Sequence, residues 1–512
     1  MPNNKSITLS IYRLWPLQLL SRIGTLLAMS LVLRPLCGLA APMVTPTLAP
    51  YVTADGADGV VTLIHIRVID GTGARPLTDQ TVRIERGAIA LIRPTSSSDI
   101  ADGRAVLDMT GHSVLPGLVG MHDHLFYIAR ADENAEHGHG FPTLLPQMSY
   151  SAPRLYLAGG VTTIRTTGSL DPYTDINLKR EIEAGRWIGP HMDVTGPYLQ
   201  GPGNPFVQMH TDETPAQTKA TVDFWAAQGA TSFKAYNNLT RAQLKAAIDA
   251  AHAHGLKITG HLCSITYPEA AEMGIDNLEH GFFFNTQLDP GKTPDVCPDS
   301  GGGPTLKAMD PDGPAAKALI ALLVRKHVAI TSTLTLGDDN GADAWPLQQR
   351  QLDVMSVEAR EALLYARNRV RQDPKQRDAS LADYDTDFRR AKELERRFVA
   401  AGGLLMAGPD PTDDGHILPG FGDQREIELL VDAGFSPLAA IRIGTLNGAI
   451  YLGQQDRIGS IAVGKRADLM IVKGDPSTKI ADIENVELVF RDGLGFDSAR
   501  LLQSVQGKYG LY

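Results

Sequence analysis

From about residue 150 onward, the sequence repeats one local pattern: a helix-like segment, a glycine or similar stop, and a short apolar run. Glycine at a helix end supplies a left-handed residue, and short β-runs that alternate with helices imply parallel strands. Six such units and two further candidate strands bring the strand count to eight, which favours a closed (β/α)8 barrel of the TIM type, an α/β fold, over an open sheet with a glycine-rich phosphate loop. The predicted strands lie near 114–119, 161–164, 191–194, 231–234, 256–259, 275–278, 328–331 and 404–406.

Segments of another character flank this repeat. Residues 60–100 and 457–495 alternate strand-like runs with turn signals such as Asp70-Gly71. We expect both chain ends to pair into one small β-sandwich domain beside the barrel. The predicted domains are therefore a signal peptide at 1–41, the barrel at 116–450, and the two parts of the sandwich at 42–115 and 451–512.

Two long insertions interrupt the repeat. Residues 285–316 are rich in Gly, Pro and Asp, whereas residues 337–400 show helical periodicity from about 357. Because both insertions follow predicted barrel strands, they belong near the active-site face. They are interpreted either as lids or as peripheral decoration.

Composition excludes some classes of partner. The 512 residues carry a net charge of −10, which argues against nucleic acid because phosphate binding needs a basic face. A small-molecule substrate is expected, and a homo-oligomer is possible. Outside the first 41 residues the only cysteines are Cys263 and Cys297, so one bridge between them and two unpaired thiols are both open alternatives.

The N-terminal residues have the features of a secretory leader. Basic residues precede an apolar run at 23–33, and a segment of small residues follows at 37–41. This order predicts a signal peptide cleaved near Ala40 or Ala41. The run is about half of the ~20 residues that a membrane-spanning helix needs. We therefore expect a periplasmic or secreted protein with no stable membrane anchor after removal of the leader.

The strongest chemical signal is the segment Pro116-Gly-Leu-Val-Gly-Met-His122-Asp-His124. Two histidines at i and i+2 at the end of a strand point to the same side, so both imidazoles can reach one metal ion. Two rival pairs are weaker. His137 and His139 have no strand beneath them, and His252 and His254 lie about 200° apart around a helix, so these four are interpreted as solvated or packing residues.

Residues of metal-ligand type also stand at the ends of later predicted strands. They are Lys234, His261, His280 and Asp410. A barrel places its chemistry at the C-terminal ends of its strands. A series of ligand-type residues at successive strand ends is hard to explain by core packing alone, so the pattern predicts a metal site.

These motifs resemble, in order along nearly the whole chain, those of the metal-dependent amidohydrolase superfamily. Within it the sequence is most similar to imidazolonepropionase and Xaa-Pro dipeptidase-like members. One departure is Thr166-Thr167-Gly168, where relatives commonly have an Asp after the Arg, and it concerns substrate contacts rather than the metal site. The resemblance rests on 116–124, Gly160-Val-Thr-Thr-Ile-Arg165, Phe233-Lys234, Gly260-His261, Glu279-His280-Gly281, Gly408-Pro-Asp410 and the closing segment 458–472.

The resemblance to binuclear members implies two divalent ions bridged by a carbamate on Lys234, because a protonated lysine would be repelled by the cations. The alternative is a lysine at the surface or in a salt bridge. His122 and His124 would hold the more buried ion, and His261 and His280 the more exposed one. Zinc suits this imidazole-rich set, although manganese and cobalt are also compatible.

In the implied mechanism, Asp410 binds the first ion and the attacking hydroxide, takes the proton and passes it to the leaving nitrogen. Tyr127, Arg165 and Tyr236 are candidate substrate contacts, each equally consistent with a packing or supporting role. His416 is a further candidate, and its alternative is a solvated loop histidine.

The sequence thus predicts hydrolysis of an amide (C–N) bond in a small substrate, with an Xaa-Pro dipeptide or an N-acyl amino acid as the leading candidate. The alternative on the same site is a lactone, ester or cyclic-amide hydrolase. A non-catalytic binding protein that kept the fold would require a broken set of ligands, and no ligand is missing.

Overall fold

The computed structural model describes residues 45–56, 59–97, 99, 105–129, 143–203, 206–338, 347–372, 374–411 and 415–510, without the side chains of 369–385. The predicted signal peptide and the pair His137 and His139 lie outside these residues. In the described part of the chain, no helix is both long enough and apolar enough to cross a membrane.

Two parallel sheets carry the strands of the central repeat. They meet on both sides, because Ser169 after β8 bridges to Pro197 in β10, and the Met121 amide after β7 donates to the Ala407 carbonyl at the end of β15. Only Val194 separates β9 from β10, so these two count as one strand of the repeat. Eight strands then follow one another in the order expected for a (β/α)8 barrel. The sheets are β7 (Leu118–Gly120), β8 (Val161–Arg165) and β9 (His191–Asp193), and β10 (Thr195–Leu199), β11 (Ser232–Ala235), β12 (Lys257–Gly260), β13 (Asn277–Leu278), β14 (Ala329–Ser332) and β15 (Leu405–Ala407).

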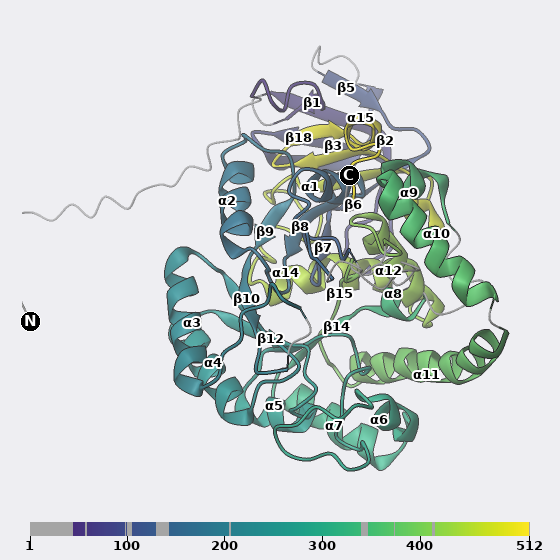
Figure 1. The fold of residues 1–512 in the computed structure, drawn as a ribbon. Coiled ribbons are helices and arrows are strands. Elements are labelled where there is room, and N and C mark those ends of the chain that lie inside the picture. Colours follow the sequence, from purple (N-terminus) through teal and green to yellow (C-terminus); the bar gives the residue numbers. More distant parts are fainter. Residues whose placement is uncertain are drawn as a thin grey trace, which may run out of the picture. The chain divides into compact units, whose positions relative to one another are not determined.

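Helices connect these strands, and their ends follow local sequence signals. Thr214, Thr240 and Thr266 cap three successive helices through capping boxes, and Gly229 and Gly274 end two of them in the left-handed conformation predicted for the stops. In Figure 1, α3, α4, α5 and α7 lie outside the parallel strands. The connecting helices are α1 (Ser151–Ala158), α2 (Pro172–Glu183), α3 (Pro215–Gln228), α4 (Arg241–Ala253), α5 (Tyr267–Met273), α7 (Pro314–Arg325), α12 (Phe421–Asp432) and α13 (Pro437–Arg442).

A mixed nine-stranded sheet joins the two ends of the chain. Residues 469–473 pair antiparallel with residues 112–116, so the yellow C-terminal strands lie beside the purple N-terminal strands in Figure 1. All nine strands belong to one hydrogen-bonded sheet, so the two separate sheets of the predicted sandwich are not seen. The strands are β1 (Val52–Asp55), β2 (Val60–Val68), β3 (Leu77–Glu85), β4 (Ala88–Pro94), β5 (Ala105–Asp108), β6 (His112–Pro116), β16 (Leu469–Lys473), β17 (Val486–Arg491) and β18 (Leu494–Asp497).

One predicted strand is corrected by the structure. Residues 114–119 do not form a single barrel strand, because β6 belongs to the mixed sheet and β7 to the barrel strands. The division falls at Gly117, whose amide donates to the Asp468 backbone carbonyl. A Cβ at Gly117 would lie 2.2 Å from Thr162, so only glycine fits where the chain passes between the sheets.

Several shorter or inserted helices complete the chain. The predicted helical periodicity from about 357 to 400 corresponds to α10 (Val357–Gln372) and α11 (Pro374–Ala400). The remaining helical segments are α6 (Gly303–Ala308), α8 (Leu334–Gly337), α9 (Gln349–Val354), η2 (Ile443–Asn447), α14 (Gly448–Tyr451), η3 (Ile480–Glu484) and α15 (Ser498–Ser504).

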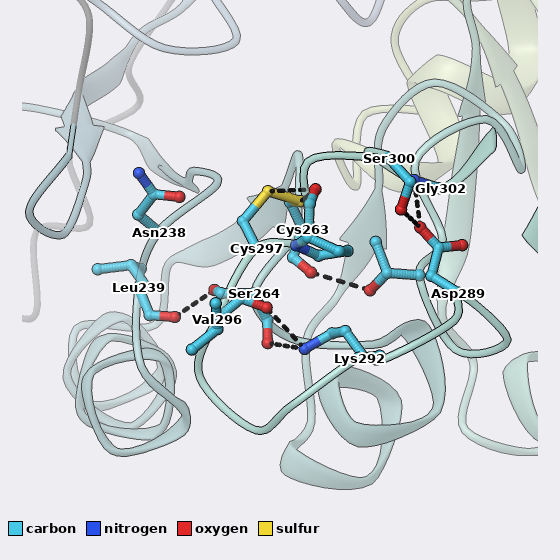
Figure 2. The surroundings of a disulfide bond; sticks show 12 residues. Asn238, Leu239, Cys263, Ser264, Asp289, Lys292, Val296, Cys297, Ser300 and Gly302 are labelled. Atoms are coloured by element: carbon cyan, nitrogen blue, oxygen red, sulfur yellow. Dashed lines mark hydrogen bonds between the residues drawn. A yellow bond between two sulfur atoms is a disulfide. The ribbon is translucent and has the colours of Figure 1, made fainter. Parts of the chain in front are cut away.

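A disulfide ties the first insertion to the segment after β12. Cys263 and Cys297 are bonded across 34 residues, which resolves the two alternatives left open by the sequence (Figure 2). The Lys292 ammonium also donates to the Ser264 carbonyl at 2.6 Å, and the Thr286 hydroxyl donates to the Cys263 carbonyl at 2.9 Å. The inserted loop is therefore anchored two residues beyond His261.

Candidate metal centre

The structure brings all six predicted metal ligands together at the C-terminal ends of the parallel strands. The His122 ring lies 5.2 Å from the His124 ring and 4.6 Å from the His280 ring, measured between centroids. The His261 and His280 rings are 4.3 Å apart. Lys234 Nζ lies 3.1 Å from His122 Nε2, and Asp410 Oδ1 lies 3.0 Å from His124 Nε2.

The side chains of the four histidines are largely buried. His122, His124 and His280 are all at most 2% exposed, whereas His261 is partly exposed. That His261 and His280 hold the more exposed of two ions stays a prediction.

Two of the ligand residues have an unusual backbone. His280 after β13 and Asp410 after β15 have φ angles of 64° and 50°, in the left-handed region that non-glycine residues seldom adopt. Such conformations cluster at functional sites, where the surrounding structure enforces them. Near Asp410 the chains approach closely: its amide donates to the His122 carbonyl at 2.9 Å, and a Cβ at Gly408 would lie 2.2 Å from the His122 amide nitrogen.

The donor set fits divalent metal ions. Nitrogen and oxygen atoms of His122, His280 and Asp410 all lie within 4.8 Å of one another. Among the described residues, His124 Nδ1 and His280 Nε2 are buried without a hydrogen-bond partner. Burial lowers the pKa of both imidazoles, to about 4 for His124, so the rings are neutral and keep the lone pairs that metal binding requires.

Lys234 has the environment that carbamate formation needs. Its side chain is 2% exposed, and burial lowers the pKa of the ammonium to about 8, although Asp410 and Glu279 act in the opposite direction. Neutral amine, the form that reacts with CO2, is then accessible near neutral pH. The geometry places this nitrogen beside His122 and away from solvent.

A supporting residue that the sequence analysis missed is Glu279. Its Oε2 lies 2.7 Å from His122 Nδ1, and its Oε1 accepts hydrogen bonds from Arg165 Nη2 at 2.6 Å and Asn277 Nδ2 at 2.7 Å. Burial alone would raise the pKa of this carboxyl, but the charges of Arg165 and His122 hold it below its usual range. Glu279 is therefore ionised, and it turns His122 so that Nε2 faces the other ligands. Glu279 directly precedes the predicted ligand His280, and this position was the sequence signal that could have identified it.

Three of the four candidate substrate contacts do not line the cavity at these ligands. Arg165 is 1% exposed, and it donates to Glu279 and the Met121 carbonyl inside the barrel, because the buried Glu279 carboxylate needs a counter-charge. Tyr127 is 4% exposed and packs against Tyr509 with ring centroids 5.8 Å apart. The expectation of substrate contact is not supported for either residue.

Of the other two candidates, one lines the cavity at the metal ligands and one does not. His416 lines a different small cavity, together with Thr335 and Asp338. Tyr236 does line the cavity at the metal ligands, with its ring 5.0 Å from the His261 ring. This cavity has a volume of about 220 Å³, and its remaining wall is apolar or aromatic: Phe126, Ile128, Leu145, Tyr198, Phe206, Met209 and Leu336.

The role of Glu279 can be tested by Glu279→Gln. We expect metal affinity to fall about 10- to 100-fold, because outer hydrogen bonds fix the orientation and basicity of a ligating histidine. The measurement is metal titration with a competing chelator. Glu487→Gln is the matched control, because Glu487 also contacts a histidine, His112, at 3.0 Å but at the surface. Unchanged affinity in Glu279→Gln would mean that Glu279 only maintains the fold.

Part of the chain matches a known protein family. The amidohydrolase family model matches residues 419–494, a segment that begins after the last of the six ligands. The curated adenine deaminase of Ligilactobacillus salivarius (strain UCC118) is 40% identical over 67 residues, which cover 13% of this chain and 11% of that protein. An adenine deaminase of Jannaschia sp. (strain CCS1) is 34% identical over 62 residues, 12% of this chain and 9% of that one. The chain thus matches about a tenth of the length of these relatives.

Solved structures resemble the chain over most of its length. An Xaa-Pro dipeptidase with bound methionine has a TM-score of 0.62 at 20% identity, covering 86% of this chain and 100% of that one. A bottromycin amidohydrolase has a TM-score of 0.63 at 19% identity, covering 91% and 95%. A putative prolidase from Bifidobacterium longum has a TM-score of 0.58 at 24% identity, covering 88% and 99%.

The likeness to these solved structures implies a TIM-barrel-type α/β fold. Residues 419–494 match the amidohydrolase family, the superfamily whose motifs the sequence resembles. The enzyme class predicted from the sequence, a hydrolase acting on carbon–nitrogen bonds, agrees with the family match and with the names of these relatives.

Proposed function

We propose that this protein hydrolyses an amide C–N bond of a small substrate at two bound divalent metal ions. The observation that carries the proposal is the convergence of His124, His261, His280, Lys234 and Asp410 on one cavity. His122 lies directly behind this cavity, with its Nε2 3.1 Å from Lys234 Nζ. Two buried imidazole nitrogens, His124 Nδ1 and His280 Nε2, have no hydrogen-bond partner among the described residues. His122 and His124 would hold one ion, His261 and His280 the other, and a carbamate on Lys234 would bridge them. Zinc is the ion that this donor set suits best.

When bound, such ions lower the pKa of a coordinated water and polarise the scissile carbonyl. Asp410 supplies the proton transfer. Burial alone would raise the pKa of its carboxyl, but His122 and His124 hold that pKa well below its usual range, so the group is ionised. It accepts a proton from the attacking water and returns it to the leaving nitrogen. The apolar wall of the cavity limits the access of bulk water.

The proposed substrate is an Xaa-Pro dipeptide or an N-acyl amino acid. Structures of an Xaa-Pro dipeptidase and of a prolidase complexed with N-methylphosphonate-L-proline share this fold, which supports the proposal without extending their activity to this chain. A lactone, ester or cyclic-amide hydrolase would use the same ligands and is the alternative outcome of the test.

The test combines metal analysis with a substrate panel. Protein purified without chelator and supplied with zinc and bicarbonate should contain two ions per chain by elemental analysis. It should release amine from Xaa-Pro dipeptides or N-acyl amino acids, detected by mass spectrometry. Turnover of lactones or esters alone would replace the amide assignment. A fully metallated protein that hydrolyses none of these compounds would overturn the proposal.

We also propose that the protein is exported and acts in the periplasm or outside the cell. The leader-like residues 1–41 support this, and so does the bond between Cys263 and Cys297, because disulfides persist in oxidising compartments. N-terminal sequencing of fractionated cells should find a start near Ala41 or Pro42. An intact Met1 in the cytoplasmic fraction would contradict export.

A further inference from the structure

A second and larger cavity adjoins the metal centre. Its volume is about 540 Å³, compared with about 220 Å³ for the cavity at the metal ligands. Tyr198 and Met209 line both cavities, so they form a shared boundary. The Tyr198 ring lies 6.3 Å from the His124 ring, and it occupies space that a side chain at Gly168 would fill, because a Cβ there would lie 2.3 Å from it. The two cavities are therefore neighbours separated by these two side chains.

The walls of the second cavity are rich in exposed aromatic surface. Phe224 on α3 lines the second cavity and is 49% exposed. Tyr173 on α2, next to the lining residue Trp225, is 48% exposed. Both rings pack on Trp225, with centroids 5.3 and 4.6 Å away. Clustered exposed aromatic residues next to a cavity are typical of ligand-binding sites. The apolar character of the walls fits an apolar or aromatic group.

The second cavity also contains a buried carboxylate. Asp212 lines it and is 1% exposed. Its Oδ1 accepts a hydrogen bond from Thr221 at 2.9 Å and lies 3.3 Å from Nε2 of the exposed His210. No lysine or arginine of the described residues forms an ion pair with it. An anionic group in this cavity would be repelled, whereas a cation would gain from Asp212 and from the aromatic faces.

We propose that this second cavity is a substrate subsite for an aromatic or branched apolar group that is neutral or positively charged. The scissile amide of the same substrate lies at the metal centre. This inference rests on the proposed function and adds a substrate class to it: the preferred amides extend past Tyr198 and Met209, and are larger than dipeptides of small residues. Because Asp212 would repel it, we expect no carboxylate on the part of the substrate that enters the second cavity.

In the kinetic test, a large side chain introduced by mutation fills the second cavity, and substrate preference is measured. Ala220 is an exposed residue of α3 that lines it, so Ala220→Trp should block it without burying a new group in the core. We measure kcat/KM for the pairs Gly-Pro and Phe-Pro, and N-acetylglycine and N-acetylphenylalanine. Wild-type protein should prefer the larger member of at least one pair, and Ala220→Trp should reduce that preference about tenfold or more. Ala227→Trp, at an exposed position of the same helix that does not line the second cavity, should keep the wild-type preference for the larger substrate.

A binding test is independent of turnover. By calorimetry, metallated wild-type protein should bind phenethyltrimethylammonium at least about tenfold more tightly than 2-phenylethanesulfonate, two probes that coordinate metals poorly. Ala220→Trp should weaken the binding of the cation, and Asp212→Asn should narrow the difference between the probes. Equal binding of both probes, or binding unaffected by Ala220→Trp, overturns the subsite.

The two tests separate the subsite from the proposed function. If no amide is cleaved but the cation binds as described, the proposed function fails and the binding site stands. If small and large amides are cleaved equally well, the function stands and the subsite fails. A change of oligomeric state in Ala220→Trp, without an effect on ligand binding, would assign the surface to contacts between subunits and would also overturn the subsite.

Discussion

Asp410→Asn should leave the fold and much of the bound metal intact while lowering kcat by about 10²- to 10⁴-fold. The amide oxygen can still coordinate weakly, but it cannot accept the proton that the ionised carboxylate takes from water. Because the loss concerns the transition state, KM should change much less than kcat. The measurement is kcat, KM and metal content under one fixed metal supply.

Asp482→Asn is the matched control for this variant. Asp482 accepts a hydrogen bond from the Asp475 amide at 2.9 Å, in the segment between two strands of the mixed sheet, outside the metal-site cavity. It should retain wild-type kcat. If Asp410→Asn kept near-normal kcat while fully metallated, Asp410 would be structural, and another group would have to carry the proton.

Lys234→Ala should act on metal binding before it acts on chemistry. Without the bridging group, we expect loss of at least one of the two ions at a metal supply that saturates the wild type. Turnover should fall by on the order of 10²-fold or more. A short carboxylic acid such as propionate offers two oxygens to the space vacated by the side chain, so it should restore part of the metal content and of the activity.

Lys257→Ala provides the comparison for Lys234→Ala. Lys257 is also a barrel-strand lysine, but its ammonium donates to the Tyr451 carbonyl at the opposite, N-terminal end of β12. It should keep both ions. Full metal occupancy in Lys234→Ala, with bicarbonate making no difference, would exclude a bridging carbamate.

Local sequence signals were sufficient for the order of elements and for most of the candidate site. Capping threonines such as Thr240 and stops such as Gly229 act within one helix turn, so their effect does not depend on distant residues. His122 and His124 were recognisable because a strand returns its side chains to the same face every second residue. His261, His280 and Asp410 were recognisable because each follows a predicted strand directly.

Arg165 and Glu279 show where sequence reasoning stops. Both stand near strand ends, 114 residues apart, and the sequence left open whether Arg165 contacts the substrate or has a supporting role. In the structure its guanidinium turns into the barrel, because a carboxylate buried at Glu279 is stable only with a nearby positive charge. No local pattern reports which distant charge will be buried.

The sequence by itself determined the alternation of strands and helices, the residues of ligand type at the strand ends and the resemblance to amidohydrolases, because each of these depends on short-range spacing or on contiguous motifs. Only the tertiary structure decided the pairing of Cys263 with Cys297, the division of the chain at Gly117 and the cavity bounded by Tyr198 and Met209. The physical reason is that contact between residues far apart in the chain depends on how whole elements pack, and the packing of elements is not encoded in any local segment.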